Sequence, residues 1–347
     1  MSNLVHGFIN TTGDLVFTTT YPSVEEHFSD GLCPVQTDLG ISTRFHYVDR
    51  DGKIIIKSSE SDSYALVVAR PFSEGLAAVA FAYRDGRGYI NKQGELIIEP
   101  DPCILGFSFK EGLTPVSVDE KLGYMDSNGK LAISPQFDWM NPRDASCPRN
   151  DQYFRELLFM FSCGFAVVLE GVIDRCNYIN QSGQLLLAKD SPISAHGRFS
   201  EDLAAVLLKN KYGYIDRSGD LVIGFNLDAA EPFSEGLAQV KVGSKWGYID
   251  TKGCLVIEPQ FDNCSPFTEG LAYVDNDCSS GYIDKTGAIN IQRHAMRPFR
   301  NGLAAYGESD NYGYIDRSGN YSIEPKFARA GDFFDERAHV SFYKDSN

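Results

Sequence analysis

Short runs in which hydrophobic and polar residues alternate cover most of this chain. One stretch shows the full pattern: Gly236–Val242 predicts a first strand, Trp246–Asp250 a second and Cys254–Glu258 a third. Such alternation places successive side chains on opposite faces of a strand. Almost no stretch has the period of an amphipathic helix. The sequence therefore predicts an all-β protein of antiparallel units with three strands, or four where another short strand precedes the first.

This strand pattern occurs nine times along the chain. An aromatic residue on the second strand marks each copy, and it follows a glycine in every copy except two, where His46 and Asn177 precede it: Phe8, Tyr47, Tyr89, Tyr124, Tyr178, Tyr214, Tyr248, Tyr282 and Tyr314. Subtracting neighbouring numbers gives steps of 39, 42, 35, 54, 36, 34, 34 and 32, so the basic unit has about 34 residues. Because no Pro/Ser-rich linker separates the units, we predict one repeat-array domain over residues 1–347.

The connection between the second and third strands predicts a tight hairpin. In Asp250-Thr-Lys-Gly253 a carboxylate can accept hydrogen bonds from the amides of its own turn, and the glycine can adopt a positive φ. The same Asp/Asn-x-x-Gly spacing begins at Asn10, Asp49, Asn91, Asp126, Asn180, Asp216, Asp284 and Asp316. A Glu-Pro pair follows the third strand in several copies, as at Glu258, where the proline disfavours further pairing.

Residue size on the first strand indicates how the units pack. Its second position is small in every copy, for example Ala204, Ala238 and Ala304, and valine usually follows two residues later on the same face. Leucine precedes most of these small residues on the opposite face, so both faces are apolar and each sheet must lie between neighbours. This predicts either a propeller-like closed toroid of about nine blades or an open β-solenoid of stacked hairpins.

The two ends of the chain favour the closed alternative. The first unit is incomplete, because residues 1–17 supply only a second and a third strand, Gly7–Asn10 and Asp14–Phe17. The last unit is incomplete in the opposite sense, because Phe333–Phe342 supplies a first strand with nothing after it. Pairing of the two fragments would complete one unit and remove exposed sheet edges.

The repeated residues resemble a known family. The string Phe-Ser-Glu-Gly-Leu-Ala-x-Val, then Lys245-Trp-Gly-Tyr-Ile-Asp250, then Leu-Val-Ile-Glu-Pro-x-Phe-Asp is similar to the WG (KWG) repeat of bacterial proteins, and it extends over essentially the whole chain. Only one copy has the tryptophan and glycine pair, at Trp246 and Gly247. The resemblance implies a scaffold but no fixed activity.

Composition narrows the function classes. The chain has 32 Lys and Arg against 47 Asp and Glu, a formal net charge of −15, which disfavours nucleic acid and suits a basic protein partner. The first residues lack a secretory signal, and no apolar run approaches the length of a membrane span, so we expect a cytoplasmic protein that does not bind a membrane. The eight cysteines form no Cys-x-x-Cys pair, and we expect buried free thiols.

The motifs that carry catalysis are mostly missing from the sequence. It has no Gly-x-Ser-x-Gly, no His-Glu-x-x-His and no phosphate-binding loop. The segment Asp49-Arg-Asp-Gly52 is weakly similar to a calcium loop, but it coincides with the repeated hairpin turn. We therefore expect no enzyme activity, no cofactor and no metal site.

The longest step between repeats contains an insertion, residues 139–163, in a divergent unit. Insertions in repeat arrays lie on one face, and this one is rich in residue types that dominate protein interfaces. The candidate partner-binding residues are Trp139, Arg143, Arg149, Tyr153, Phe154 and Arg155. The alternative interpretation, equally supported, is that apolar residues of the insertion, such as Phe161, fill a gap left by the divergent unit.

Three function classes follow from these observations. The first is a noncatalytic binding module that presents loops on a rigid β scaffold to another protein, and a more specific version is an immunity or inhibitor protein that neutralises a basic toxin or nuclease. The second is a binder of a glycan or small ligand through exposed aromatic residues such as Tyr83 or Tyr306. The third, which the sequence favours least, is an enzyme whose site forms only in the folded chain.

Overall fold

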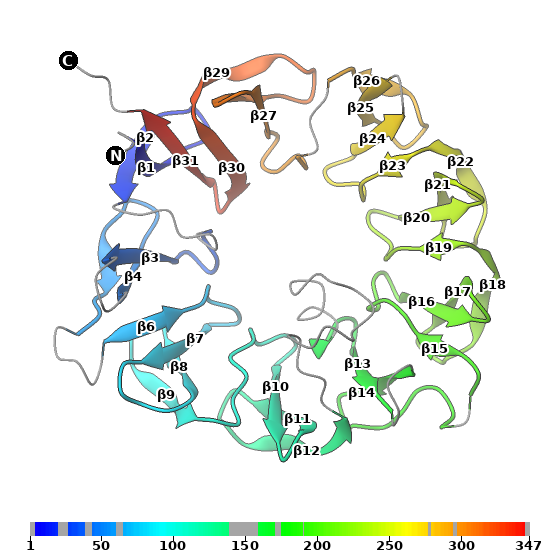
Figure 1. Cartoon of the computed structure of the whole chain (residues 1–347), viewed down its shortest axis with the longest axis horizontal. Coiled ribbons are helices and arrows are strands. Elements are labelled where there is room, and N and C mark those ends of the chain that lie inside the picture. The colour runs from blue at the N-terminus through cyan, green and yellow to red at the C-terminus, as the bar shows by residue number, and fades with distance from the viewer. Residues whose placement is uncertain are drawn as a thin grey trace. The chain divides into compact units, whose positions relative to one another are not determined.

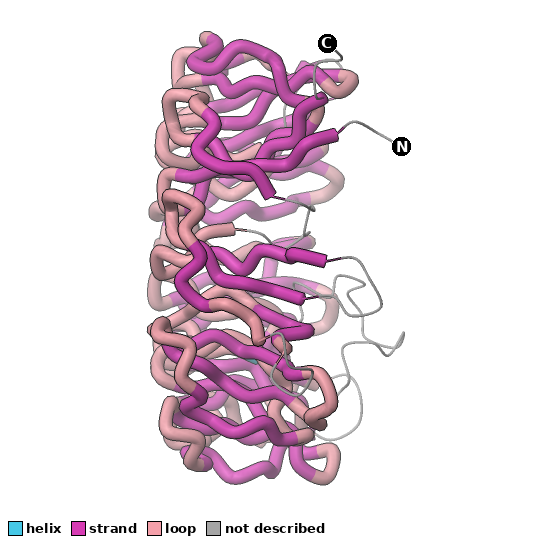
Figure 2. The backbone as a smooth tube through the Cα atoms, turned by 90° about the vertical axis from the view of Figure 1, so that its left-hand side faces the viewer, coloured by secondary structure: helices cyan, strands magenta, loops and turns pink. Residues whose placement is uncertain are grey.

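The computed structural model describes residues 4–19, 27–38, 44–59, 65–138, 159–170, 175–189, 191–276, 279–293 and 297–343. In these residues the regular elements are all strands, which short turns and loops connect (Figure 2). The chain divides into two compact units, residues 1–108 together with 290–347, and residues 109–289. The all-β prediction is therefore confirmed for the described residues.

The first unit contains four antiparallel sheets. In spatial order their strands are β2 (Leu15–Thr19), β1 (Leu4–Ile9), β31 (Arg337–Tyr343) and β30 (Arg329–Phe334); β3 (Cys33–Asp38), β4 (Arg44–Val48) and β5 (Ile54–Ile56); β6 (Leu66–Ala69), β7 (Leu76–Phe81), β8 (Arg87–Asn91) and β9 (Leu96–Asp101); β27 (Ala304–Glu308), β28 (Asn311–Ile315) and β29 (Tyr321–Phe327).

The second unit contains a five-stranded sheet and three four-stranded sheets. Their strands are β10 (Leu113–Val118), β11 (Lys121–Asp126), β12 (Leu131–Asp138), β13 (Phe165–Leu169) and β14 (Cys176–Asn180); β15 (Ser194–Ala195), β16 (Leu203–Leu208), β17 (Lys211–Asp216) and β18 (Leu221–Leu227); β19 (Ala229–Ala230), β20 (Leu237–Val242), β21 (Lys245–Asp250) and β22 (Leu255–Phe261); β23 (Asn263–Cys264), β24 (Ala272–Asn276), β25 (Ser279–Ile283) and β26 (Ile289–Ile291), which begins at the last residue of this unit.

Eight small antiparallel sheets in the described part of the chain form a β-propeller, the fold that the sequence predicted, although about nine blades were expected. The nine repeats occupy eight sheets because the five-stranded sheet contains two of them, with Tyr124 on β11 and Tyr178 on β14. A single residue pair, Asp138 with Leu169, connects β12 to β13 between these two repeats. The insertion lies between these two strands in the sequence, and its residues 139–158 are outside the described ranges.

The aromatic residue that marks each repeat lies in the core. Phe8 and all eight tyrosines of the series have less than 2% of their surface exposed. The tyrosine hydroxyl donates to a backbone carbonyl in the segment that follows its own third strand, for example Tyr214 to Glu231 O at 2.7 Å and Tyr248 to Ser265 O at 2.8 Å. A buried hydroxyl without a partner would be costly. The tyrosine therefore fills the core and connects successive segments of the chain.

The glycine before this aromatic residue allows the third strand to approach closely. A Cβ atom added to Gly213 would lie 2.5 Å from the carbonyl oxygen of Ile223, and one added to Gly247 would lie 2.5 Å from that of Ile257. The pairing of β17 with β18 shifts register at this position, as does that of β21 with β22. Only glycine leaves room for such an approach.

The predicted hairpin turns are confirmed. In the turn at Asp250, the Oδ1 atom accepts hydrogen bonds from the backbone N–H groups of Lys252 and Cys254, and Gly253 has a φ of 82°. The same pattern occurs at Asp216, where Oδ1 accepts from Ser218 and Asp220. The carboxylate thereby stabilises a type I turn that ends in a left-handed glycine.

The two ends of the described chain complete one sheet. Strand β1 pairs with β31 from Leu4 opposite Tyr343 to Ile9 opposite Ala338 (Figure 1). The sheet thus takes two strands from each end of the chain, as the complementary fragments predicted. At this seam the ring of buried His6 stacks on that of half-buried His339.

The expectation of buried thiols is wrong for most described cysteines. Only Cys33 is fully buried among the six that the structure describes, while Cys103, Cys163, Cys176 and Cys264 are half-buried and Cys254 is exposed. The cysteines occupy different positions within their repeats, so the strand pattern does not fix their burial.

Candidate functional site

A two-residue turn precedes the first long strand of each repeat, and these turns connect neighbouring repeats. In the turn Ser234-Glu235-Gly236-Leu237, the backbone groups of Ser234 and Leu237 pair with each other. Both central residues are left-handed, with φ of 55° at Glu235 and 86° at Gly236, as a type I′ turn requires. The Ser234 hydroxyl donates to the carbonyl of Phe267 in the next repeat at 2.8 Å.

Where the contact is described, the carboxylate of one turn points to the turn of the next repeat. Five junctions show the same contact, in which a carboxylate oxygen accepts the backbone N–H of the following turn's glycine at 2.8 to 3.0 Å: Asp335 to Gly31, Asp30 to Gly75, Glu111 to Gly164, Glu201 to Gly236 and Glu235 to Gly270. Hydrogen bonds with a charged acceptor are stronger than neutral ones. The repeated acidic residue thus connects one repeat to the next.

A side chain from the neighbouring hairpin turn often completes this contact. Lys285 Nζ lies 3.4 Å from the Glu235 carboxylate, and the guanidinium of Arg50 lies 3.4 Å from that of Asp335. In the divergent repeat Gln181 takes the same position and donates to Glu111 at 3.2 Å. Each carboxylate in these copies is therefore held by a backbone N–H and a side-chain donor of the following repeat.

The carboxylate is missing at Cys163. This residue stands at the acidic position of its turn with a φ of 52°, but a thiol replaces the carboxylate. The following repeat also differs, since Asp202, with a φ of 64°, replaces the glycine whose N–H would donate. Arg217 occupies the hairpin position equivalent to Lys285 and lies 3.4 Å from Asp202.

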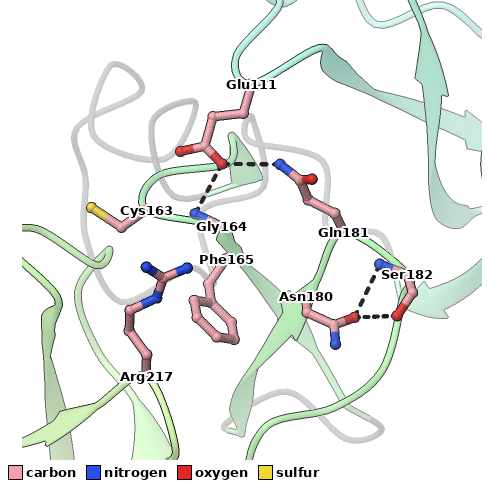
Figure 3. Close-up of a pocket in the computed structure, with 8 residues that line it drawn as sticks. All are labelled: Glu111, Cys163, Gly164, Phe165, Asn180, Gln181, Ser182 and Arg217. Atoms are coloured by element: carbon pink, nitrogen blue, oxygen red, sulfur yellow. Dashed lines mark hydrogen bonds between the residues drawn. The ribbon is translucent and has the colours of Figure 1, made fainter.

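A cavity of about 560 Å³ opens at this interrupted junction. It is lined by Glu111, Cys163, Gly164, Phe165, Asn180, Gln181, Ser182 and Arg217 (Figure 3). The Arg217 guanidinium lies 5.9 Å from the centre of the Phe165 ring. A Cβ atom added to Gly164 would lie 3.1 Å from Nη2 of Arg217. The guanidinium is thus directed at the turn that lacks the carboxylate.

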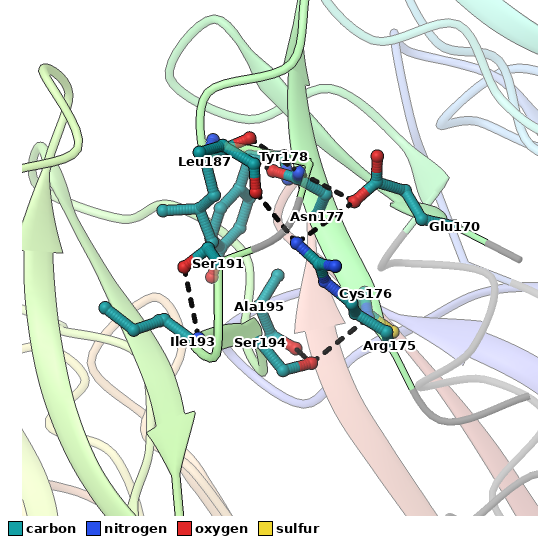
Figure 4. Close-up of polar contacts among 11 residues, drawn as sticks. Glu170, Arg175, Cys176, Asn177, Tyr178, Leu187, Ser191, Ile193, Ser194 and Ala195 are labelled. Atoms are coloured by element: carbon teal, nitrogen blue, oxygen red, sulfur yellow. Dashed lines mark hydrogen bonds and ion pairs between the residues drawn. The ribbon is translucent and has the colours of Figure 1, made fainter.

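The divergent repeat differs a second time at Asn177, on β14. Its fully buried side chain replaces the glycine of other copies, donates to Leu187 O at 2.9 Å and accepts from Leu187 N at 3.0 Å (Figure 4). Its Nδ2 also donates to Glu170 at 2.9 Å, and Arg175 donates to Ala188 O at 2.8 Å. The amide therefore takes over the pairing that a third strand provides elsewhere. The bonds between the Asn177 side chain and the Leu187 backbone thus hold the loop after β14 in place.

The six candidate residues of the insertion, Trp139, Arg143, Arg149, Tyr153, Phe154 and Arg155, lie outside the described residues. The end of the insertion is described, and there Phe159, Met160 and Phe161 are buried. The Phe161 ring packs edge-on against Tyr124 at 5.0 Å, and Tyr124 donates to Phe159 O at 2.9 Å. Phe161 thus fills the core position that Phe233 fills beside Tyr214. Phe161 is therefore a regular core residue of the repeat, and the gap-filling interpretation stays a prediction for the rest of the insertion.

The other predicted candidates lie apart from the cavity. Tyr83 is 86% exposed in the turn after β7, whereas Tyr306 on β27 contacts the guanidinium of Arg293, 4.9 Å from the ring centre. Sequence reasoning missed Cys163, Asp202 and Arg217. Alignment of the turns would have found the first two, because cysteine and aspartate break the Glu-Gly pattern there.

Two features are absent from the described residues. These residues contain no group of three His, Cys, Asp or Glu side chains that could hold a metal ion. They also contain no helix with the length and apolar character that crossing a bilayer requires.

The fold is similar to solved structures of low sequence identity. A crystal structure of the eukaryotic initiation factor matches with a TM-score of 0.52, 11% identity and 99% of each chain covered. AztD from Citrobacter koseri matches with a TM-score of 0.37, 11% identity, 93% of this chain and 95% of that one. KlHsv2 with its loop 6CD replaced matches with a TM-score of 0.41, 12% identity, 76% of this chain and 92% of that one. The first of these supports the propeller fold and nothing more. No curated protein sequence matches the chain.

The repeats themselves match a family. The profile of the WG containing repeat matches residues 7–38, 47–81, 88–101, 123–142, 212–246, 246–277 and 312–341, which together make up more than half of the chain. Residues 143–211, which include Cys163, Asn177 and Asp202, lie between two of these matches. With these matches and the resemblance of its repeats, the chain belongs to the family of proteins built from WG containing repeats.

Proposed function

We propose that this protein is a noncatalytic binding module and that a protein partner docks at the interrupted repeat. The observation that carries the proposal is a coincidence of departures from the repeat. The insertion, the missing carboxylate at Cys163, the asparagine at position 177 and the cavity all fall within or beside residues 139–217. A stretch of a repeat scaffold in which several departures gather is where a specific function can be added.

The regular repeats are suited to holding such a site rigidly. The buried tyrosines and the turn carboxylates fix each repeat to the next through hydrogen bonds. Loops on a rigid β scaffold lose little conformational freedom when a partner binds, and this favours affinity. The scaffold therefore supports the binding role, while the interrupted repeat supplies the part that differs.

A second, more specific candidate is an inhibitor of a basic protein such as a toxin or nuclease. It is favoured by the net charge of −15, which would accelerate the approach of a cationic partner. Association driven in this way weakens as salt screens the charges. Salt dependence consequently separates this candidate from docking through apolar and aromatic contacts.

The test is capture of partners from native lysate at low and high salt, followed by reconstitution with the purified partner. The key variant replaces Trp139, Tyr153 and Phe154 with alanine. Tyr83→Ala is the matched control, because Tyr83 is an aromatic residue that is 86% exposed in a repeat the family profile matches. We expect the triple variant to weaken binding at least tenfold and the control to bind as the parent chain does. A partner that binds all three equally, or no reproducible partner, would refute docking at this site.

A further inference from the structure

The interrupted junction can be compared atom by atom with the intact ones. At the Glu235 junction three groups meet: the carboxylate of Glu235, the backbone N–H of Gly270 at 2.9 Å and the ammonium of Lys285 at 3.4 Å. At the Asp335 junction the same three groups are the carboxylate, the N–H of Gly31 at 3.0 Å and the guanidinium of Arg50 at 3.4 Å. The repeat is therefore built as a receptor for one carboxylate, which the chain normally supplies itself.

At the Cys163 junction the receptor remains and the carboxylate is gone. Asp202 keeps the left-handed turn, with the backbone hydrogen bonds between Ser200 and Leu203 intact, so its N–H stands at the place of the glycine N–H. Arg217 stands at the place of Lys285 and Arg50, and its guanidinium lies against the turn at Cys163 and Gly164. The thiol of Cys163 is shorter than a glutamate side chain and carries no carboxylate oxygens.

We propose that the Cys163 junction, between the cavity and the turn at Asp202, binds a carboxylate presented by the partner, namely a glutamate or aspartate side chain of an exposed turn. In the bound state this carboxylate accepts hydrogen bonds from the Arg217 guanidinium and the Asp202 N–H, and thus replaces the missing group of the repeat. An arginine fork is the side chain best suited to a carboxylate. The inference rests on the proposed binding function and specifies what the partner presents there.

Two acidic side chains, Glu111 and Asp202, already lie near the site. The Glu111 carboxylate that lines the cavity already accepts from Gly164 and Gln181, so it is held at its own junction. Asp202 competes for Arg217, but this ion pair is largely exposed, with 55% of the arginine and 71% of the aspartate side chain accessible. Exposed pairs of this kind are weak and readily exchanged. A carboxylate of the partner would contact both Arg217 and the Asp202 N–H. The Asp202 side chain contacts Arg217 alone of these two groups.

The experiment uses the full chain and a probe that copies the repeat's own turn. The probe is the acetylated, amidated peptide Phe-Ser-Glu-Gly-Leu, and the same peptide with glutamine in place of glutamate is its control. Free acetate forms a third arm that distinguishes a small carboxylate from a peptide. Binding is followed by the NMR signal of the Arg217 side-chain Nε–H. We expect the glutamate peptide to shift this signal and the glutamine peptide to bind at least tenfold more weakly.

The decisive variant is Cys163→Glu, which returns the carboxylate to the chain and fills the site. It should raise Tm and reduce binding of the glutamate peptide at least tenfold. Cys163→Ser, which leaves the site empty, should bind as the parent does, and Lys285→Gln, at an intact junction, should not change binding. Equal binding of the two peptides, unchanged binding by Cys163→Glu, or a shift caused equally by acetate would overturn the inference.

These outcomes are separate from those of the binding proposal. If a captured partner binds the Cys163→Glu variant as tightly as the parent chain, the carboxylate inference fails and the binding function stands. If the glutamate peptide binds specifically but no partner is found, the carboxylate site stands and docking of a protein at this repeat fails.

Discussion

The imidazole rings of His6 and His339, from opposite ends of the described chain, stack with their centres 5.8 Å apart. His6 Nδ1 lies 2.7 Å from the hydroxyl of Ser341, on the same strand as His339. Both rings are in the β1 and β31 pairing that joins the ends of the chain. The seam therefore contains two groups that can each gain a proton in mildly acidic solution.

Stability should fall in acid because of this seam. Burial lowers the pKa of His339 from 6.5 to about 4, with the nearby His6 as a second cause, and burial with Arg329 lowers that of His6. A folded-state pKa below the unfolded one means that the stabilisation is complete above pH 6.5 and is lost as the pH falls toward 4. For His339 the difference corresponds to about 3 kcal/mol. Denaturant unfolding from pH 7.5 to 4 should show a smaller loss in His339→Gln, and parallel curves would contradict this cause.

Removing the hydroxyl of a core tyrosine should destabilise the chain without changing the fold. Tyr214→Phe leaves the carbonyl of Glu231 without the bond that Tyr214 donates at 2.7 Å. We expect a loss of about 1–2 kcal/mol in the free energy of unfolding. Tyr212→Phe, on the same strand but only half-buried, is the control and should cost less. Equal losses would show that the hydroxyl bond contributes nothing specific.

A methyl group at the repeated glycine should disrupt its sheet. The Cβ atom of Gly247→Ala would lie 2.5 Å from Ile257 O and 2.7 Å from Pro259 N, so β22 must move. We expect a loss of about 1–3 kcal/mol, measured by denaturant unfolding. The matched control is Gly224→Ala on β18, since nothing lies within 4 Å of its added Cβ. If both variants are equally stable, close approach of the strands does not explain the glycine.

The amide of Asn177 should be required for the loop after β14. Asn177→Ala removes the partners of both Leu187 N and Leu187 O, which are 3.0 and 2.9 Å away. Two buried backbone groups would lose their bonds, at a cost on the order of 3 kcal/mol. Hydrogen exchange should report the change directly as faster exchange of the Leu187 amide. Unchanged protection of that amide, with Tyr214 as the internal reference, would contradict the assignment.

Much of the fold was predictable because the same local chemistry recurs. The turn at Asp250 and Gly253 is determined by a side chain and a glycine within five residues, so one copy explains the others. The pairing of the two ends was predictable because Phe8 and Ala338 belong to complementary fragments of one repeat. The repeats therefore indicated which distant segments pair, which a sequence without repeats does not indicate.

The candidate site was less predictable, for reasons that are geometric. The exception at Asn177 is visible in the sequence, but its bonds to Leu187 depend on the course of the loop after β14. Cys163 departs visibly from the repeat, yet the contact of Glu235 with the following turn is what shows that a carboxylate is missing there. Stacking of His6 on His339 follows only once the register of β1 against β31 is known.

The shared sheet at the seam also sets an order of events during synthesis. Strand β1 is made early and β31 late, so β1 must wait without this neighbour while almost all of the other strands are translated. Segments generally fold in the order in which they emerge from the ribosome. The seam is an exception, because its sheet can form only after the residues of β31 have emerged. Until then this edge of β1 is unpaired, and an unpaired edge invites mispairing that chaperone binding would prevent.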